Sequence, residues 1–170
     1  MAVAKDEFNN IPDIREVIDY LLKHRVVVGV FGEDDSHILM VARVHEYGVD
    51  IEVTEAMRNY LHASGLHLRE GTEEISIPER AFIRSGFDSS KEDFFNTAKH
   101  LIQQALFLEI PPETALRVIG EDIRNRLQEH MTDLSSPPNH PFTIKNKGSS
   151  NPLIDEGRLR SAITHKIVSG

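Results

Sequence analysis

The sequence predicts an α+β domain, a small and mostly antiparallel sheet covered by two long helices, with an N-terminal helix and an extended mobile loop. Three patterns support this fold class: two long amphipathic segments separated by Pro111-Pro112, several short β-branched or alternating segments, and a polar, proline-rich stretch near the C-terminus. At 170 residues the chain is long enough to bury one sizeable core, so we expect a single domain over residues 1–170.

Residues 1–25 are expected to form an N-terminal helix arm. Asn10 supplies an N-cap and Pro12 suits the first turn. Apolar residues then recur on one helical face at Ile14, Val17, Ile18, Leu21 and Leu22.

Residues 26–134 are expected to hold the sheet and the main helices. The β-branched run 26–32 predicts a strand buried on both faces, and the acidic cluster 33–36 predicts a turn. Residues 38–47 fit either a strand or a short helix. Thr54 is typical of the N-cap of a short helix that ends near Gly65, and Gly71-Thr72 predicts a hairpin turn.

The second half of the chain has clearer helix signals. Ser89 and Glu92 have the spacing of a capping box, which predicts a helix from there to about Leu108. A second helix is expected from the proline pair to about His130. Residues 135–151 are expected to be a mobile loop, and 152–170 a closing turn and strand.

The composition excludes several classes of protein. The chain has no cysteine, which excludes a disulfide framework, a thiolate zinc site and a cysteine nucleophile. Its N-terminus turns acidic where a signal peptide would be apolar, and it has no run of about 18 apolar residues. We therefore expect a soluble protein that is not exported and has no membrane partner.

Charge is distributed unevenly along the chain. The net charge is −8, which argues against a protein whose affinity comes mainly from neutralising phosphates. From Phe142 to the end, however, basic residues exceed acidic ones by three. This basic tail either docks onto the acidic face of an identical neighbour, in a head-to-tail ring, or consists simply of solvated lysines.

No catalytic constellation is apparent in the sequence. The nine histidines lack metal-binding spacing, and His62 and His67, five residues apart, are expected on different faces of a helix. None of the seven lysines follows an acidic residue by two positions, as in common nuclease motifs. Phosphate-binding glycine loops and the Gly-x-Ser-x-Gly motif are also absent from the sequence. We expect no cofactor, no metal ligand and no catalytic residue.

Three segments occur in a familiar order. They are His45-Glu46-Tyr47-Gly48, then Ile77-Pro78-Glu79-Arg80-Ala81-Phe82-Ile83-Arg84, and Pro152-Leu153-Ile154-Asp155-Glu156-Gly157-Arg158-Leu159-Arg160-Ser161-Ala162-Ile163. Together they resemble the bacteriophage tail-component or virion-morphogenesis family, over residues 26 to 168. The chain departs from the family pattern at Tyr47 for phenylalanine, Ala81 for proline and Glu156 for threonine, and each change keeps the physical role of the position.

The resemblance implies structural or interface roles for particular residues. Pro78 would set an extended backbone, Arg80 would reach a carboxylate or backbone carbonyls, and Phe82 would anchor the core. Asp155 would cap a short turn and Gly157 would supply a positive φ. The full set of candidates is His45, Glu46, Tyr47, Gly48, Pro78, Arg80, Phe82, Lys145, Lys147, Pro152, Leu153, Asp155, Gly157, Arg158 and Leu159. Lys145 and Lys147, on the expected mobile loop, are the preferred interface candidates.

The resemblance also implies a function. It indicates a structural virion protein of the head-tail neck that acts in tail completion, is present in the host cytoplasm during assembly, and forms a ring whose expected size is a hexamer. The ring would link the connector or head-completion protein to the tail terminator or tail tube protein, and DNA would pass through its lumen without specific binding. Two alternatives stay open: a tail terminator that caps the tube, and a metal-dependent DNA-processing enzyme that uses His45, Glu46 and Asp50.

Overall fold

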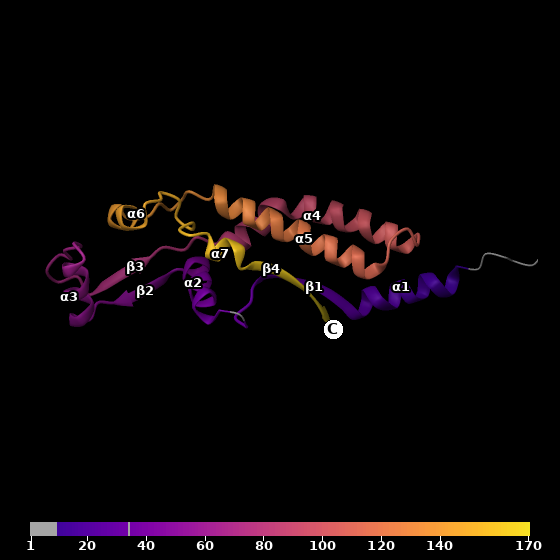
Figure 1. The fold of residues 1–170 in the computed structure, drawn as a ribbon, viewed down its shortest axis with the longest axis horizontal. Coiled ribbons are helices and arrows are strands. Elements are labelled where there is room, and N and C mark those ends of the chain that lie inside the picture. The colour runs from indigo at the N-terminus through magenta and orange to yellow at the C-terminus, as the bar shows by residue number, and fades with distance from the viewer. Residues whose placement is uncertain (1–9, 34) are drawn as a thin grey trace, which may run out of the picture. The chain divides into compact units, whose positions relative to one another are not determined.

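The computed structural model describes residues 10–33 and 35–170, which divide into two compact units. The first unit contains the described residues up to Gly29, together with Ser90–Asn125 and Thr164–Gly170. The second contains the described part of Val30–Ser89, together with Arg126–Ile163. Figure 1 labels the elements, of which the long helices α4 (Phe82–Leu106) and α5 (Pro112–Asp133) contribute residues to both units.

The first unit combines α1 (Ile11–Lys23), β1 (His24–Val30) and β4 (Ile163–Ser169) with the adjoining parts of α4 and α5. Strand β1 pairs with β4, and the N–H of Gly170 donates to the carbonyl of Lys23 at 2.7 Å, so the end of β4 meets the start of β1 in an antiparallel pair. The core of the unit consists of Val17, Ala105 and Ala115, against which Leu21, Leu101, Leu106 and Ile110 pack.

The second unit contains α2 (Ser36–Tyr47), β2 (Val49–Glu52), α3 (Glu55–Ala63), β3 (Glu74–Ile77), α6 (Pro141–Lys147) and α7 (Arg158–Ser161). Strands β2 and β3 are antiparallel, with Val49 opposite Ile77 and Glu52 opposite Glu74. Phe82, at the start of α4, is fully buried, as are Leu127 and Met131 of α5.

The α+β fold class is confirmed, because two long helices pack against small antiparallel sheets. The expected α1, β1, α3, α5 and closing strand all form within a few residues of their predicted bounds. Thr54 caps α3 as predicted, its Oγ1 accepting from the N–H of Met57 at 3.2 Å. Asn10 stands at the N-cap of α1, but its side chain makes no capping hydrogen bond there.

Several local predictions were wrong. Strand β1 is not buried on both faces, because the sheet it joins has two strands and Val27 stays exposed. Helix α4 begins at Phe82, seven residues before Ser89, whose hydroxyl lies inside the helix and donates to the carbonyl of Gly86. The segment 38–47, left open between strand and helix, is helical.

The loops also differ from expectation. The turn at Gly71 precedes β3, but it is not a hairpin turn, because β3 pairs with β2 and α3 lies between the two strands in the chain. The stretch expected as an extended loop, 135–151, contains α6, which begins at Pro141 and ends at Gly148 in a left-handed conformation. His62 and His67 were expected to point apart, yet their rings meet edge to face at 4.4 Å between centroids.

Candidate functional site

The end of α2 is held tightly against the segment that precedes α4. Asp35 caps the start of α2 by accepting from the N–H groups of His37 and Ile38 at 3.0 and 3.1 Å. Gly48 ends the helix with a φ of 69°. A Cβ atom at Gly48 would lie 2.9 Å from the backbone nitrogen of Glu79, so only glycine permits this approach.

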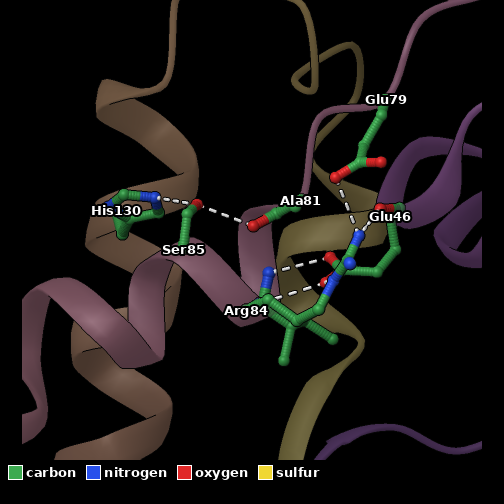
Figure 2. A network of polar contacts seen from close by, with 7 residues as sticks. Glu46, Glu79, Ala81, Arg84, Ser85 and His130 are labelled. Carbon is green, nitrogen blue, oxygen red and sulfur yellow. Dashed lines mark hydrogen bonds and ion pairs between the residues drawn. The ribbon is translucent and has the colours of Figure 1, made fainter.

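Glu46, near the end of α2, caps α4 from 37 residues away in the sequence. Its carboxylate is buried, with 5% of the residue exposed, and accepts from the N–H groups of Ile83 at 2.9 Å and Arg84 at 3.0 Å (Figure 2). These donors belong to the first turn of α4 and lack partners within the helix. The negative charge also suits the positive end of the helix dipole.

Arg84 completes this cap from the other side. Its Nε donates to the Glu46 carboxylate at 3.0 Å, and its Nη2 donates to the Glu46 carbonyl at 2.6 Å and to Glu79 at 2.9 Å. The guanidinium lies 4.9 Å from the centre of the Tyr47 ring. The adjacent Ser85 bonds the Ala81 carbonyl and His130 of α5, which joins α4 to its neighbour (Figure 2).

Arg80 is buried, with 4% of its surface exposed, and ties the segment before α4 to the one before α6. Its Nε donates to the carbonyl of Pro137 at 2.8 Å, and its Nη2 donates to the carbonyl of Pro138 at 3.2 Å and to Oδ1 of Asn139 at 3.1 Å. Its Nη1 lies 3.4 Å from Nδ1 of His45. Every one of these acceptors is neutral, so the guanidinium charge is solvated by dipoles and burial lowers its pKa.

His45 is held in its neutral form by this environment. Burial, together with the charges of Arg80 and Lys147, lowers the pKa of His45 to about 4. The neutral ring can accept a hydrogen bond from Arg80 Nη1 at Nδ1. The main-chain N–H of Arg80 also donates to the carbonyl of His45 at 2.7 Å, so the two segments are joined through backbone and side chain.

Lys147 and Asn151 form hydrogen bonds with the start of the third resembling segment, residues 152–163. Lys147 Nζ donates to the carbonyl of Asn151 at 2.7 Å, and burial lowers its pKa against the opposing effect of Asp155. The Asn151 side chain accepts from the N–H groups of Leu153 and Ile154, both at 3.0 Å, and donates to the carbonyl of Thr132 at 2.7 Å. We call the combined set of His45, Glu46, Arg80, Arg84, Asn139, Lys147 and Asn151 the motif joint.

The predicted site residues fall into three groups. Those at the joint or in the core beside it are His45, Glu46, Tyr47, Gly48, Arg80, Phe82, Lys147, Pro152, Leu153 and Leu159. Pro78 lines a pocket, and Lys145 is exposed on α6 beside another. Arg158 forms an ion pair with Asp35 at 2.9 Å.

The prediction that Asp155 caps the closing turn was wrong. Gly157, with a φ of 80°, is the N-cap of α7, and no side chain caps that helix. Asn151 performs the expected bonding a few residues earlier. Asn151, Asn139 and Arg84 are the joint residues that sequence reasoning missed, although an asparagine before proline, as at Asn151, is a typical signal of side-chain bonding to the backbone.

Two pockets flank the motif joint. One, of about 540 Å³, has walls of Leu66, Leu68 and Phe142 and reaches His45 and Arg80, and none of its described lining residues is acidic. The other, of about 410 Å³, is lined by a mixture of charges that includes Lys147, Arg158, Asp155 and Glu156, and it also reaches His45. Both pockets thus border the joint, and of the two only the first has no acidic residue among its described lining.

The described residues contain no group of three histidines or carboxylates placed to hold a metal ion. Asp50 lies exposed on β2, where it accepts from the hydroxyl of Ser76 at 2.6 Å, while His45 and Glu46 bond to different partners. Within the described ranges, every helix is too short or too polar to cross a membrane. Comparison of the chain with protein-family models, curated proteins and solved structures finds no match.

Proposed function

We propose that this chain is a structural protein of the bacteriophage virion, acting at the head-tail neck in tail completion. The observation that carries the proposal is the motif joint. The three segments whose order resembles the phage family are far apart in the sequence, and hydrogen bonds link them: Glu46 accepts from the start of α4, and Arg80 bonds Asn139, which with Lys147 donates to the carbonyl of Pro152. Their side chains therefore have a common structural purpose, which is to hold one unit in a single arrangement.

The hydrogen bonds that Glu46 accepts favour a structural function over that of a metal-dependent enzyme. An enzyme of that kind needs its carboxylate free to bind a cation. Here the Glu46 carboxylate already accepts from two backbone N–H groups and one guanidinium. Binding a metal ion would leave the first turn of α4 without its cap, so the arrangement suits a scaffold better than a metal centre.

In the proposed assembly, copies of the chain form a ring, with a hexamer as the expected size. One face of the ring contacts the connector or head-completion protein, and the other contacts the tail terminator or tail tube protein. The net charge of −8 would make the lumen repel phosphates, so DNA passes without being gripped. The protein would act in the host cytoplasm during assembly and remain in the virion neck.

The proposal is tested by complementation with a phage whose copy of this gene carries a nonsense mutation. Under restrictive conditions we expect filled heads and finished tails that stay separate in electron micrographs, and purified protein should join them. Normal particles from the mutant would overturn the proposal. Tails of uncontrolled length would assign the tail-terminator function instead.

A second test addresses the enzyme alternative directly. Purified protein is incubated with plasmid DNA and Mg²⁺ or Mn²⁺, and the expected result is intact plasmid. Asp50→Asn is the suitable variant, because Asp50 is exposed and bonds the hydroxyl of Ser76, whereas changing Glu46 would damage the fold. Cleavage by the natural chain that is lost in Asp50→Asn would overturn the structural proposal.

A further inference from the structure

The turn between α4 and α5 presents an apolar and acidic protrusion. Phe107 is 75% exposed, Leu108 is 38% exposed, and the exposed Glu109 follows them. We call these three residues the hairpin tip. Backbone bonds to Gln103, Ala105 and Gln104 close the end of α4 at this place.

The backbone of the hairpin tip is strained. Leu108 has a φ of 61°, a left-handed conformation that is unfavourable for a residue with a side chain and is usually adopted by glycine at helix ends. Leu108 and Phe107 also expose apolar surface at this point. A strained backbone that displays large apolar side chains indicates that they bind something outside their own unit.

The pocket of about 540 Å³ in the second unit has complementary properties. We call it the socket. Its apolar walls are formed by Leu66, Leu68 and Phe142, and the buried charge of Arg80 lies at its edge with neutral partners. His45 is neutral because its pKa is about 4, and it adds no charge at pH 7. An adjoining pocket, which shares Leu66 and Phe142, carries Lys145.

We propose that the hairpin tip of one copy inserts into the socket of the next copy. Phe107 and Leu108 would cover the apolar walls, and Glu109 would supply the carboxylate that Arg80 and Lys145 lack. Each copy has one tip and one socket, so the contact is heterologous, which is the type of contact that builds a ring when the rotation between successive copies closes. This inference rests on the proposed ring and names the surfaces that build it.

Single variants test each surface while leaving the joint intact. On the tip, Phe107→Ala removes the apolar anchor and Glu109→Lys reverses the charge, with Glu92→Lys on the exposed side of α4 as the matched control. In the socket, Thr143→Glu adds a carboxylate at an exposed lining position of α6, with Asn96→Glu on α4 as the control. Circular dichroism verifies that all five variants fold.

The natural chain and the variants are compared by light scattering after gel filtration over a range of concentrations. We expect the natural chain to associate, the tip and socket variants to need at least about tenfold higher concentration to associate, and both controls to behave like the natural chain. An equal mixture of Phe107→Ala and Thr143→Glu should stop at a heterodimer, because it contains one intact tip and one intact socket. The double variant Glu109→Lys with Thr143→Glu should recover association, because the charges are then reversed on both sides.

The outcomes separate this inference from the function on which it rests. If the natural chain forms rings and the tip variants form them equally well, the tip-in-socket contact is wrong while the ring stands. A natural chain that stays monomeric at all concentrations would also overturn the contact. The neck function would then be judged by the joining of heads to tails in the complementation experiment.

Discussion

Each of the two units of the chain is stabilised by a different kind of interaction. The first has an apolar core in which Ala105 and Ala115 pack around Val17, and larger side chains such as Phe94, Leu116 and Ile119 are also buried. The second adds to its apolar core a buried polar joint in which Glu46 and Arg80 are almost inaccessible. Apolar packing tolerates substitution in proportion to the area lost, whereas a buried charge is costly as soon as one of its partners is removed.

This difference indicates which substitutions should destabilise the protein most. In the first unit, the described apolar core spreads its contacts over many side chains, and loss is expected to be graded. In the second, Glu46 accepts from the first turn of α4, and Arg80 bonds both His45 and the segment 137–139. The predictions below run from the largest expected effect to the smallest.

Replacing Glu46 should cause the greatest loss of stability. Glu46→Ala leaves the N–H groups of Ile83 and Arg84 without acceptors and removes a buried ion-pair partner, which should lower the free energy of unfolding by about 3 kcal/mol. Urea unfolding followed by circular dichroism measures it. The control is Glu79→Ala, which removes the exposed ion pair with the same arginine and should cost less than about 1 kcal/mol. Equal losses in the two variants would contradict the special importance of the joint.

The neutral state of His45 should make the second unit sensitive to acid. The pKa of His45 falls to about 4 in the fold from an ordinary value near 6.5, so the unfolded chain binds more protons between these values. Stability contributed by the neutral ring is complete above about pH 6.5 and declines as the pH falls towards 4, by up to about 3 kcal/mol.

A comparison of urea midpoints at pH 7 and pH 5 isolates this contribution. The natural chain should lose more stability between the two values than His45→Gln, in which the amide oxygen can still accept from Arg80 and nothing titrates. The difference between the two chains removes the effect of the carboxylates, since they are common to both. An identical loss in both chains would show that His45 is not the titrating group.

In the first unit, the tightest contact between a helix and the sheet is at Gly120. A Cβ atom there would lie 2.4 Å from Cδ2 of His165 and 2.7 Å from its Cγ, so the ring on β4 must move. Gly120→Ala should therefore lower the unfolding free energy by about 2 kcal/mol even though alanine favours the helix.

Gly86→Ala in the second unit is the matched comparison. The nearest atoms to its added Cβ would be the end of the Leu127 side chain at 2.8 Å and the His130 ring at 3.1 Å, both farther away than the His165 ring is from Gly120. Its cost should be clearly smaller in the same thermal unfolding experiment. A larger loss at Gly86 than at Gly120 would reverse the expected ranking of the two contacts.

Helix caps should give the smallest effects. Thr54→Ala removes the bond to the N–H of Met57 and should cost about 1 kcal/mol, confined to α3. Asn10→Ala should cost almost nothing, because the Asn10 side chain makes no capping bond. Hydrogen exchange at the first amides of each helix measures both, and faster exchange in Asn10→Ala alone would contradict the assignment of the caps.

The elements that sequence predicted well are those whose signals are local. The apolar periodicity of α1 and α5, the Thr54 cap and the proline pair each act within a few residues, and each appears in the structure where expected. The capping box at Ser89 failed because a stronger cap, supplied by Glu46, starts α4 earlier. Residues 135–151 were expected to be a loop because their composition is polar. That composition does not indicate that carbonyls in this stretch accept hydrogen bonds from Arg80.

The candidate site was only partly predictable for the same reason. The resemblance selected Glu46 and Arg80 as residues worth noting, and it gave for Arg80 only the kind of partner, a carboxylate or backbone carbonyls, and none for Glu46. Their acceptors and donors lie 35 to 59 residues away in the chain. The contact between His62 and His67 shows the same limit at short range, since it depends on a turn that helical geometry does not describe.

By itself, the sequence determined the α+β class, the pair of long helices, the closing strand and the segments that carry the resemblance. Periodicity, caps and prolines act through residues that are close together in the sequence, so the sequence alone reveals them. Only the tertiary structure decided that α2 is a helix, where α4 begins and that the separate segments share one joint. Those outcomes depend on satisfying buried charges and backbone N–H groups, and the partners that satisfy them are brought close only when the chain folds.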